Sequence, residues 1–344
     1  YSESKNYRNY FIDLIEDLKN NKNFSIIYLT SDKNDTQKIG KLIEPIYIGD
    51  NFFRILVFTF LKCDLLIMTL TDLGNHIIKK SNKCKNYLYI FHSLVSTHKS
   101  YSFEAFRNYD IVLTNGDYQK KELEFTEDEF NFPKKKIFNT GYIYLERLKK
   151  QIRNDKVQNK ILFAPSWNNS KSNLFDDYAE KIVSILIKKH NLILRTHPES
   201  IKRSKIVIKN LYRIQKLNSK FEINSDLTQL KFLDESFLLI TDNGGMGMEY
   251  LIYQKKPVIF INYKDKIHNI NFKKYKQEPI ENKFRKEFGV ELELNDLINL
   301  DKKIDEAVSS FHKKIKKIDQ FVIDHGIITK NQTQNAKEVI LKII

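Results

Sequence analysis

Polar residues that could bind an anion follow several short apolar runs of the chain. The runs YLYIF, ILFAP, LILR and LLIT lead into His92-Ser93, Ser166-Trp167, Thr196-His197-Pro198 and Asp242-Asn243-Gly244-Gly245. In open parallel sheets, ligands bind beyond the carboxyl ends of the strands, where loops lead into helices whose first N–H groups are available. We therefore interpret these polar ends as candidate site residues.

The stretch LLITDNGGMGMEYL, residues 238–251, predicts a strand, a tight turn and a helix. Gly244 and Gly245 permit positive φ and close approach of a ligand to the backbone, while the helix would direct its N–H groups and dipole at that ligand. We interpret the turn as a phosphate-binding turn. A turn without any ligand would explain the same residues, and the glycines do not reproduce the dinucleotide pattern G-x-G-x-x-G.

Residues 195–198, RTHP, place a guanidinium and an imidazole two positions apart at the end of an apolar run. Alternate residues of a strand share one side, so Arg195 and His197 could face the same anion. Arg195 would bind it through paired hydrogen bonds, and His197 as a single donor or an acid. A structural histidine is the alternative, but the arginine and the helix-starting Pro198 favour a functional role.

His92 is the ionisable residue that directly follows a strongly apolar run in the first half of the chain. With an ordinary pKa of about 6.5, an imidazole can accept a proton from a hydroxyl group at neutral pH. The alternative is a half-buried imidazole bonded to the backbone. His98, six residues later in a loop or helix start, is the second candidate.

The acidic residues do not favour a metal site. Asp242 ends an apolar run, Glu249 falls inside the following helix, and no D-x-D element joins them. We expect Asp242 to cap the turn, or both residues to bind ribose hydroxyls. Ser166 and Trp167 are placed with the nucleotide-binding residues, although packing or a hinge is the favoured role for Trp167, the only tryptophan.

Short apolar runs alternate with amphipathic segments, which predicts parallel sheets covered on both faces and an α/β fold. The predicted strands are Phe24–Leu29, Asp64–Met68, Tyr87–Phe91, Asp110–Leu113, Lys160–Ala164, Leu192–Arg195, Phe237–Ile240 and Pro257–Ile261. The predicted helices include Tyr7–Lys19, Phe52–Leu61, Asp117–Phe125, Tyr178–Lys189 and Gly247–Tyr253.

The length of 344 residues predicts two domains. The charged stretch 148–159 has little apolar periodicity and marks the expected boundary, which gives domains at 1–150 and 151–310. Residues 311–344 read as helices, with Phe311, Ile315, Ile318 and Val322 at helical spacing. We expect this terminal segment to brace the two domains.

Composition narrows the class of protein. The chain has 41% hydrophobic residues, no apolar run long enough to span a bilayer, and no secretion signal at its start. Cys63 and Cys84 are too few and too isolated for a disulfide framework or a zinc site, so we expect reduced thiols and a cytoplasmic protein. The sequence begins at Tyr1, which leaves a preceding membrane tether open. A net charge of +15 favours anionic partners, including the inner membrane surface, although solvated faces explain most basic clusters.

In this order, the residues resemble the CDP-glycerol glycerophosphotransferase family, the teichoic-acid-type polymerases and their relatives in Gram-negative surface-polysaccharide clusters. The resemblance rests on His92 after a first-half strand, APSW at 164–167, R-x-H-P at 195–198, and TD followed by small residues and Glu249. It covers nearly the whole chain, including TGYIYLERL at 140–148 and the segments KPVIFIN and EPIENKFRKEFG.

The resemblance implies a GT-B architecture, in which two Rossmann-like domains with parallel sheets face each other across a cleft. The first domain would carry the acceptor chemistry and the second the nucleotide donor. By this match His92 is the base, Arg195 and His197 steady the donor diphosphate, and Asp242 to Gly245 form the nucleotide-phosphate turn. The family has His-Gly where this chain has His92-Ser93, and it has hydroxyl residues where this chain has Gly244-Gly245. The two glycines of this chain are similar to the Ser-Gly-Gly turn of UDP-sugar epimerases.

We expect a transferase that moves glycerol phosphate, or a similar polyol phosphate, from a CDP-activated donor to a surface polysaccharide (teichoic acid, capsule or lipopolysaccharide) or a lipid-linked acceptor. We expect no cofactor, no metal and no nucleic acid, and peripheral contact with the inner face of the cytoplasmic membrane. The first alternative is a GT-B glycosyltransferase that uses a nucleotide sugar. The second is a non-catalytic polyanion-binding module, for which the sequence has no basic-aromatic ladder.

Overall fold

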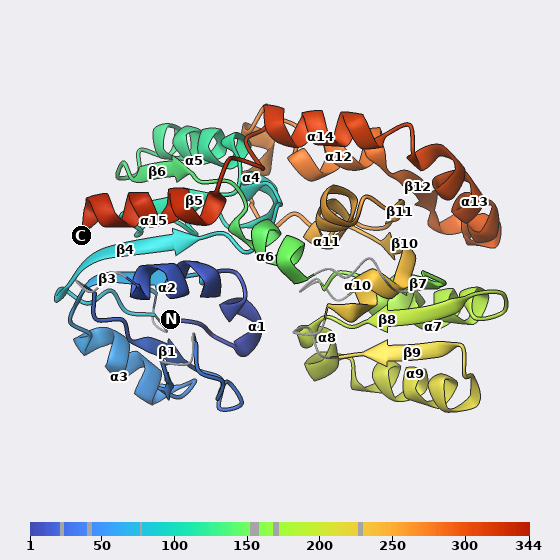
Figure 1. The fold of residues 1–344 in the computed structure, drawn as a ribbon, viewed down its shortest axis with the longest axis horizontal. Helices are drawn as coiled ribbons and strands as arrows, with labels where there is room; N and C mark the ends of the chain where they lie inside the picture. Colours follow the sequence, from blue (N-terminus) through green and yellow to red (C-terminus); the bar gives the residue numbers. More distant parts are fainter. Residues whose placement is uncertain (21–23, 40–42, 76–77, 152–157, 168–171, 226–229) are drawn as a thin grey trace. The chain divides into compact units, whose positions relative to one another are not determined.

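The computed structural model describes residues 1–344 except 21–23, 40–42, 76–77, 152–157, 168–171 and 226–229 (Figure 1). The chain forms two compact units. The first unit contains Tyr1–Arg147, Ile267–Lys276 and Val322–Ile344, and the second contains Leu148–Lys266 and Gln277–Phe321. Half of the predicted boundary stretch 148–159, residues 152–157, lies outside the described residues. The C-terminal segment contributes to both units.

The first unit is built on parallel strands. A four-stranded sheet has the order β3-β4-β5-β6, and a separate pair is formed by β1 and β2. The strands are β1 (Tyr28–Thr30), β2 (Pro45–Tyr47), β3 (Cys63–Met68), β4 (Cys84–Ile90), β5 (Ile111–Thr114) and β6 (Lys136–Asn139). The helices are α1 (Lys5–Arg8), α2 (Ile12–Lys19), α3 (Phe52–Phe60), α4 (Thr97–Ser100), α5 (Asp117–Glu129), α6 (Ile143–Gln151, which continues into the second unit) and α15 (Gln332–Ile343).

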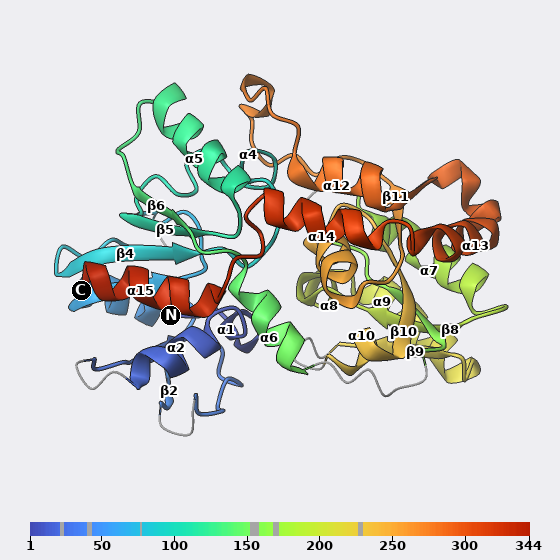
Figure 2. The ribbon, with the colours of Figure 1, turned by 45° about the horizontal axis from the view of Figure 1, so that its top comes forward.

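Alternating residues of β4 explain why both faces of this sheet are covered. Tyr87 and Tyr89 pack into one apolar cluster with Phe58 of α3, while Leu88 and Ile90 pack into another. Successive strand residues point to opposite faces, so a strand that is apolar throughout needs a layer on each side. Helix α15 lies beside α2 over the second cluster (Figure 2).

The second unit has a six-stranded parallel sheet of order β12-β11-β10-β7-β8-β9. Its strands are β7 (Lys160–Phe163), β8 (Asn191–Arg195), β9 (Phe221–Asn224), β10 (Ser236–Thr241), β11 (Val258–Asn262) and β12 (Val290–Glu293). Its helices are α7 (Leu174–Leu186), α8 (Pro198–Arg203), α9 (Lys205–Leu217), α10 (Lys231–Glu235), α11 (Gly245–Glu249), α12 (Ile280–Phe288), α13 (Leu300–Phe311) and most of α14 (Ile315–Asp324), with a π-helix at Tyr250–Gln254.

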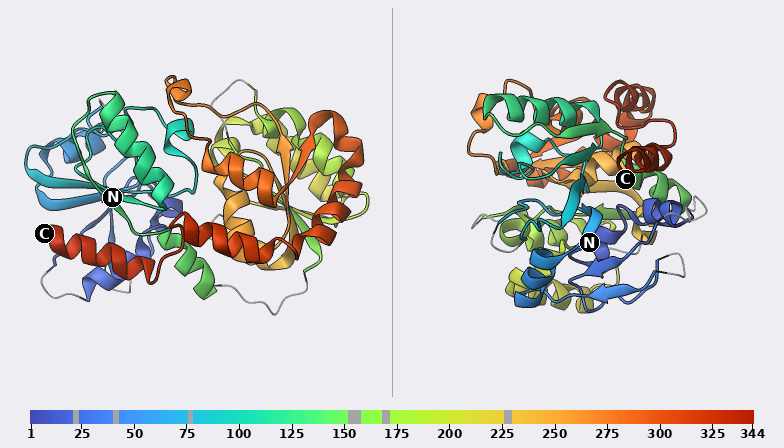
Figure 3. Two further views of the ribbon diagram at one scale, coloured as in Figure 1. Left: turned by 90° about the horizontal axis from the view of Figure 1, so that it is seen from above. Right: turned by 90° about the vertical axis from the view of Figure 1, so that its left-hand side faces the viewer.

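Helices cover both faces of this second sheet (Figure 3). Helices α7, α9 and α13 pack on one face, in a cluster that contains Ile161 and Phe163 of β7. Leu162 lies between them in sequence, is fully buried, and points to the other face. The α/β class and the parallel sheets predicted from the sequence are confirmed.

Differences from the predicted elements are local. All eight predicted strands overlap an observed strand, but Phe24–Leu29 overlaps β1 at two residues only. The predicted helix Tyr7–Lys19 is divided into α1 and α2. The predicted helix Gly247–Tyr253 begins at Gly245 instead and continues as a π-helix from Tyr250. Strands β2, β6, β9 and β12 were not expected.

Candidate nucleotide-binding site

The carboxyl ends of β10, β7 and β8 lie side by side in the second unit, because these strands are neighbours in the parallel sheet. From β7 the chain continues to β8 and β9 on one side of the sheet, and then to β10, β11 and β12 on the other. The direction of strand addition therefore reverses between β7 and β10. Open α/β sheets bind ligands at such a switch point.

Ser166 and Asp242 join the two loops at this switch point. The N–H of Ser166 donates to Oδ1 of Asp242 over 2.7 Å, and the Ser166 hydroxyl donates to Oδ2 over 3.0 Å. Asp242 is only 5% exposed. Burial raises the pKa of its carboxyl above the ordinary value, and the two hydrogen bonds from Ser166 act in the opposite direction. The expected cap of the turn is thus a bridge between two loops.

The glycines of the turn do not adopt positive φ. Gly244 is extended, with φ −89° and ψ 157°, and Gly245 begins α11. The freedom to adopt positive φ is therefore not used at these two positions. A Cβ at position 244 would lie 3.1 Å from Cβ of Ser166. The residue is small because the loop after β7 approaches it closely. A Cβ on Gly247 would lie 2.4 Å from the ring of Phe260, so this glycine serves packing.

Arg195 reaches from the end of β8 toward the turn after β10. Its Nη1 contacts Sδ of Met246 at 3.4 Å, and its guanidinium lies 4.7 Å from the ring centre of Phe232. The thioether sulfur accepts a weak hydrogen bond from the guanidinium, and the ring of Phe232 makes a cation–π contact with it, so both of these partners are uncharged. Arg195 lies at the strand end beside α11, and its anion-binding role stays a prediction.

His197 caps the amino end of α8. Its Nδ1 accepts a hydrogen bond from the N–H of Glu199 over 3.2 Å. Because Nδ1 is an acceptor, the neutral ring carries its proton on Nε2, which suits donation to a phosphate oxygen. The ring stacks on Trp167, with centroids 6.0 Å apart and planes 19° apart. Trp167 also lies 5.6 Å from the guanidinium of Arg203, in keeping with the packing role favoured for it.

Asn243 and Glu249 differ in their surroundings. Asn243 Oδ1 accepts a hydrogen bond from Nη1 of Arg285 over 2.6 Å, and its amide donates to the main-chain oxygen of Lys264 over 3.3 Å. Glu249 ends α11 and is buried. Arg285, on α12, is also paired with Glu291 at 2.9 Å.

Two cations at this edge were not expected from the sequence, Arg285 and Lys266. Nζ of Lys266 donates to the main-chain oxygen of Trp167 over 2.7 Å. Burial lowers the pKa of Lys266, and the charge of Asp242 acts in the opposite direction. Burial also lowers the pKa of Arg285. The cations at this edge are therefore only partly solvated, and such an environment favours the binding of an anionic ligand.

His92 lies in the first unit, directly beyond β4. Its half-buried ring makes an edge-to-face contact with Tyr7 at 5.1 Å and a tilted contact with Tyr10 at 5.8 Å. The hydroxyl of Tyr142 donates to its main-chain oxygen over 3.3 Å. The imidazole is thus held by aromatic neighbours at the carboxyl edge of its sheet.

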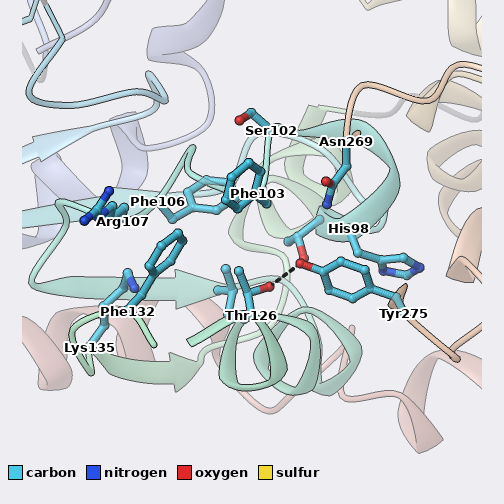
Figure 4. A pocket seen from close by; sticks show the side chains of 12 residues that line it. His98, Ser102, Phe103, Phe106, Arg107, Thr126, Phe132, Lys135, Asn269 and Tyr275 are labelled. Atoms are coloured by element: carbon cyan, nitrogen blue, oxygen red, sulfur yellow. Dashed lines mark hydrogen bonds between the residues drawn. The ribbon is translucent and has the colours of Figure 1, made fainter. Parts of the chain in front are cut away.

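His98, the second candidate base, has a structural position. It is 1% exposed, its Nδ1 lies 3.0 Å from Oε1 of Glu122, and its ring stacks on Tyr275 at 5.0 Å. The N–H and the hydroxyl of Thr97 donate hydrogen bonds to the same carboxylate, over 2.6 and 2.7 Å. The adjoining cavity has a volume of about 10 Å³ (Figure 4), which is room for about one water molecule.

In the described part of the chain, no group of three or more His, Cys, Asp and Glu side chains lies close enough to hold a metal ion. Across the same residues, no helix is long and apolar enough to cross a membrane.

The two units define the GT-B-like class of fold, in which Rossmann-like α/β units each carry a parallel sheet. Among solved structures, the wall teichoic acid polymerase TagF is similar, with a TM-score of 0.61, 17% identity, and coverage of 99% of this chain and 87% of that chain. UDP-GlcNAc 2-epimerase from Neisseria meningitidis has a TM-score of 0.66, 13% identity, and coverage of 99% and 98%.

A third similar structure is UDP-GlcNAc 2-epimerase from Methanocaldococcus jannaschii, with a TM-score of 0.58, 14% identity, and coverage of 99% of this chain and 98% of that chain. No family model matches the sequence, and no curated protein matches it. At these identities the likeness concerns the fold, and the GT-B-like fold expected from the sequence is confirmed.

Proposed function

We propose that the protein is a transferase that moves glycerol phosphate, or a similar polyol phosphate, from a CDP-activated donor to a hydroxyl of a surface polysaccharide or lipid-linked acceptor. The observation that supports this most is the hydrogen-bonded Ser166–Asp242 pair at the switch point of the second sheet. It fixes two loops beside Arg195, Lys266 and Gly244, where a diphosphate would find cations and a bare main chain. TagF, which shares the fold, was solved with CDPG.

The proposed reaction assigns one role to each group. His92 takes the proton from the acceptor hydroxyl, and the resulting oxygen attacks the phosphorus distal to cytidine. The bond from this phosphorus to the bridging oxygen breaks, and CMP leaves with that oxygen. Arg195 and the Nε2–H of His197 stabilise the charge that spreads over the phosphoryl oxygens in the transition state. If these protein groups supply the stabilising charge, the proposed step needs neither a metal ion nor an additional cofactor.

The release of CMP from CDP-glycerol, with a synthetic lipid-linked glycerol phosphate primer as acceptor, tests this proposal. His92→Ala should lower the turnover rate by about 100-fold or more, the usual contribution of general-base catalysis. His312→Ala is the matched control, because His312 is exposed and lies in the second unit beyond α13. Equal CMP release by wild type and His92→Ala would remove His92 from the mechanism.

A nucleotide-sugar glycosyltransferase is the alternative that a specific observation favours. Gly244-Gly245 occupies the place where the CDP-glycerol family has hydroxyl residues, and two of the similar structures are UDP-GlcNAc 2-epimerases. This alternative uses the same strand-end site. It predicts that UDP or GDP binds more tightly than CDP.

We further propose that the exposed face of α3 contacts an anionic membrane surface, where a lipid-linked acceptor would be found. Phe52, Phe53 and Phe60 are 65%, 72% and 65% exposed, whereas Phe58 on the opposite side of the helix is fully buried. Lys62, two residues after the end of α3, is exposed, and the chain carries a net charge of +15. Apolar side chains combined with positive charge are typical of a helix that lies in a membrane interface.

A further inference from the structure

The two cysteines of the chain lie directly opposite each other in the first unit. Cys63 begins β3, Cys84 begins β4, and their Cα atoms are partners in the parallel register. The Sγ atoms are 3.3 Å apart. Neighbouring strands are about 4.8 Å apart, which falls inside the Cα separation of about 4.4–6.8 Å found in disulfides. Both cysteines are free thiols. Although they are far apart in the sequence, strand pairing brings together these two residues, which are 21 positions apart.

The two sulfur atoms are chemically unequal. Cys63 donates its S–H to Sγ of Cys84, and this hydrogen bond is the main reason why the pKa of Cys84 is lowered to about 7 and that of Cys63 is raised. Cys84 is buried, while Cys63 is half-buried. The thiolate, which is the nucleophilic form, is thus favoured on Cys84. The thiol of Cys63, which can react next with an oxidised Cys84, is in contact with it.

We propose that Cys63 and Cys84 form an oxidisable dithiol site that small peroxides convert to an intramolecular disulfide. The Cys84 thiolate attacks one peroxide oxygen, the O–O bond breaks, and hydroxide leaves, so that Cys84 becomes a sulfenic acid. The sulfur of Cys63 then attacks Sγ of Cys84, the S–O bond breaks, and water leaves after the Cys63 proton is transferred. The pair loses two electrons and hydrogen peroxide is reduced to two waters.

We expect oxidation of the two cysteines to have little effect on His92, the candidate base, because the two sites lie at opposite ends of β4. The cysteines lie at the amino ends of β3 and β4, whereas His92 follows the carboxyl end of β4, about 26 Å further along at about 3.3 Å per residue. Next to the cysteines, the ion pair of Asp64 and Lys85, at 2.6 Å, spans the same two strands. The strands are already aligned, so bond formation requires only side-chain movement. This inference does not depend on the proposed transferase activity.

The test is oxidation of the folded full chain with hydrogen peroxide, followed by alkylation of remaining thiols with N-ethylmaleimide and intact-mass analysis. The expected product is 2 Da lighter than the reduced chain, carries no alkyl group, and on proteolysis yields one peptide pair joined through Cys63 and Cys84. Closing the bond should raise the Tm by about 3 °C or more, because it restricts the unfolded chain. Cys63→Ser and Cys84→Ser are the matched variants, and neither can form the intramolecular bond.

Under the proposal, Cys63→Ser exposed to peroxide gains 16 or 32 Da on Cys84, since no resolving thiol is present. The disulfide should also form faster in the native chain than in the same chain unfolded in urea, since folding aligns the thiols. The proposal is overturned if both thiols of the native chain remain alkylatable after peroxide treatment. Disulfide-linked dimers in place of the intramolecular product, or faster formation in urea, would also overturn it.

Discussion

Ser166 donates its main-chain N–H and its hydroxyl to the two carboxylate oxygens of Asp242, at 2.7 and 3.0 Å. The two residues are 76 positions apart in the chain and come from the loops after β7 and β10. The buried carboxylate of Asp242 therefore ties together the edge of the sheet to which we assign nucleotide binding. Loss of either hydrogen bond should lower both the stability of the protein and its affinity for the ligand.

Ser166→Ala should lower the free energy of unfolding by about 1–3 kcal/mol, because the buried Asp242 carboxylate loses one donor. Urea denaturation followed by circular dichroism measures this change. Ser309→Ala, at an exposed serine of α13, is the matched control and should stay within about 0.5 kcal/mol of wild type. Equal stability of Ser166→Ala and wild type would show that the bridge does not hold the loops.

Gly247→Ala should destabilise the protein even though alanine is favoured over glycine in helices by about 1 kcal/mol. The new Cβ would lie 2.4 Å from Phe260 and 3.2 Å from Thr241, and overpacking of this kind costs about 1–3 kcal/mol. Gly244→Ala meets only Ser166, at 3.1 Å, and should affect nucleotide affinity more than stability. Thermal unfolding of the two variants compares them, and a more stable Gly247→Ala would contradict the packing role.

Replacement of Phe52, Phe53 and Phe60 by serine should reduce binding to vesicles of phosphatidylglycerol and phosphatidylethanolamine by about tenfold or more, because each buried phenylalanine contributes about 1.5–3 kcal/mol. Cosedimentation measures the bound fraction. The control carries serine at Ile206 and Leu217, which are 78% and 89% exposed on α9. Unchanged binding of the α3 variant, or no binding by the wild type, would rule out α3 as the contact surface.

The strands missed by sequence analysis have one property in common: β2, β6, β9 and β12 all lie at sheet edges. An edge strand is covered less completely than a central one and can carry charged residues. In β12, with the sequence VELE, valine and leucine are buried and both glutamates are exposed. A search for runs that are apolar throughout finds the centres of parallel sheets and overlooks such strands.

The candidate site was predictable where it depends on strand ends. The order of the apolar runs placed Ser166, Arg195 and Asp242 at such ends, and the structure brings these three ends side by side. Which atoms pair could not be predicted, because the Ser166–Asp242 bridge depends on the neighbouring position of β7 and β10 in the sheet. Lys266 and Arg285 carry no local pattern, and the two thiols meet only through the register of β3 and β4.

Binding of CDP to the edge formed by β10, β7 and β8 is the central claim, and isothermal titration calorimetry with CDP, UDP and GDP tests it most directly. Of the three nucleotides, wild type should bind CDP most tightly. Arg195→Ala should weaken CDP binding about 10- to 100-fold, because it removes charge-assisted hydrogen bonds that contribute about 1.5–3 kcal/mol. Arg213→Ala, at an exposed arginine of α9, should bind as wild type does. Absence of CDP binding, or equal affinity in wild type and Arg195→Ala, would contradict the account.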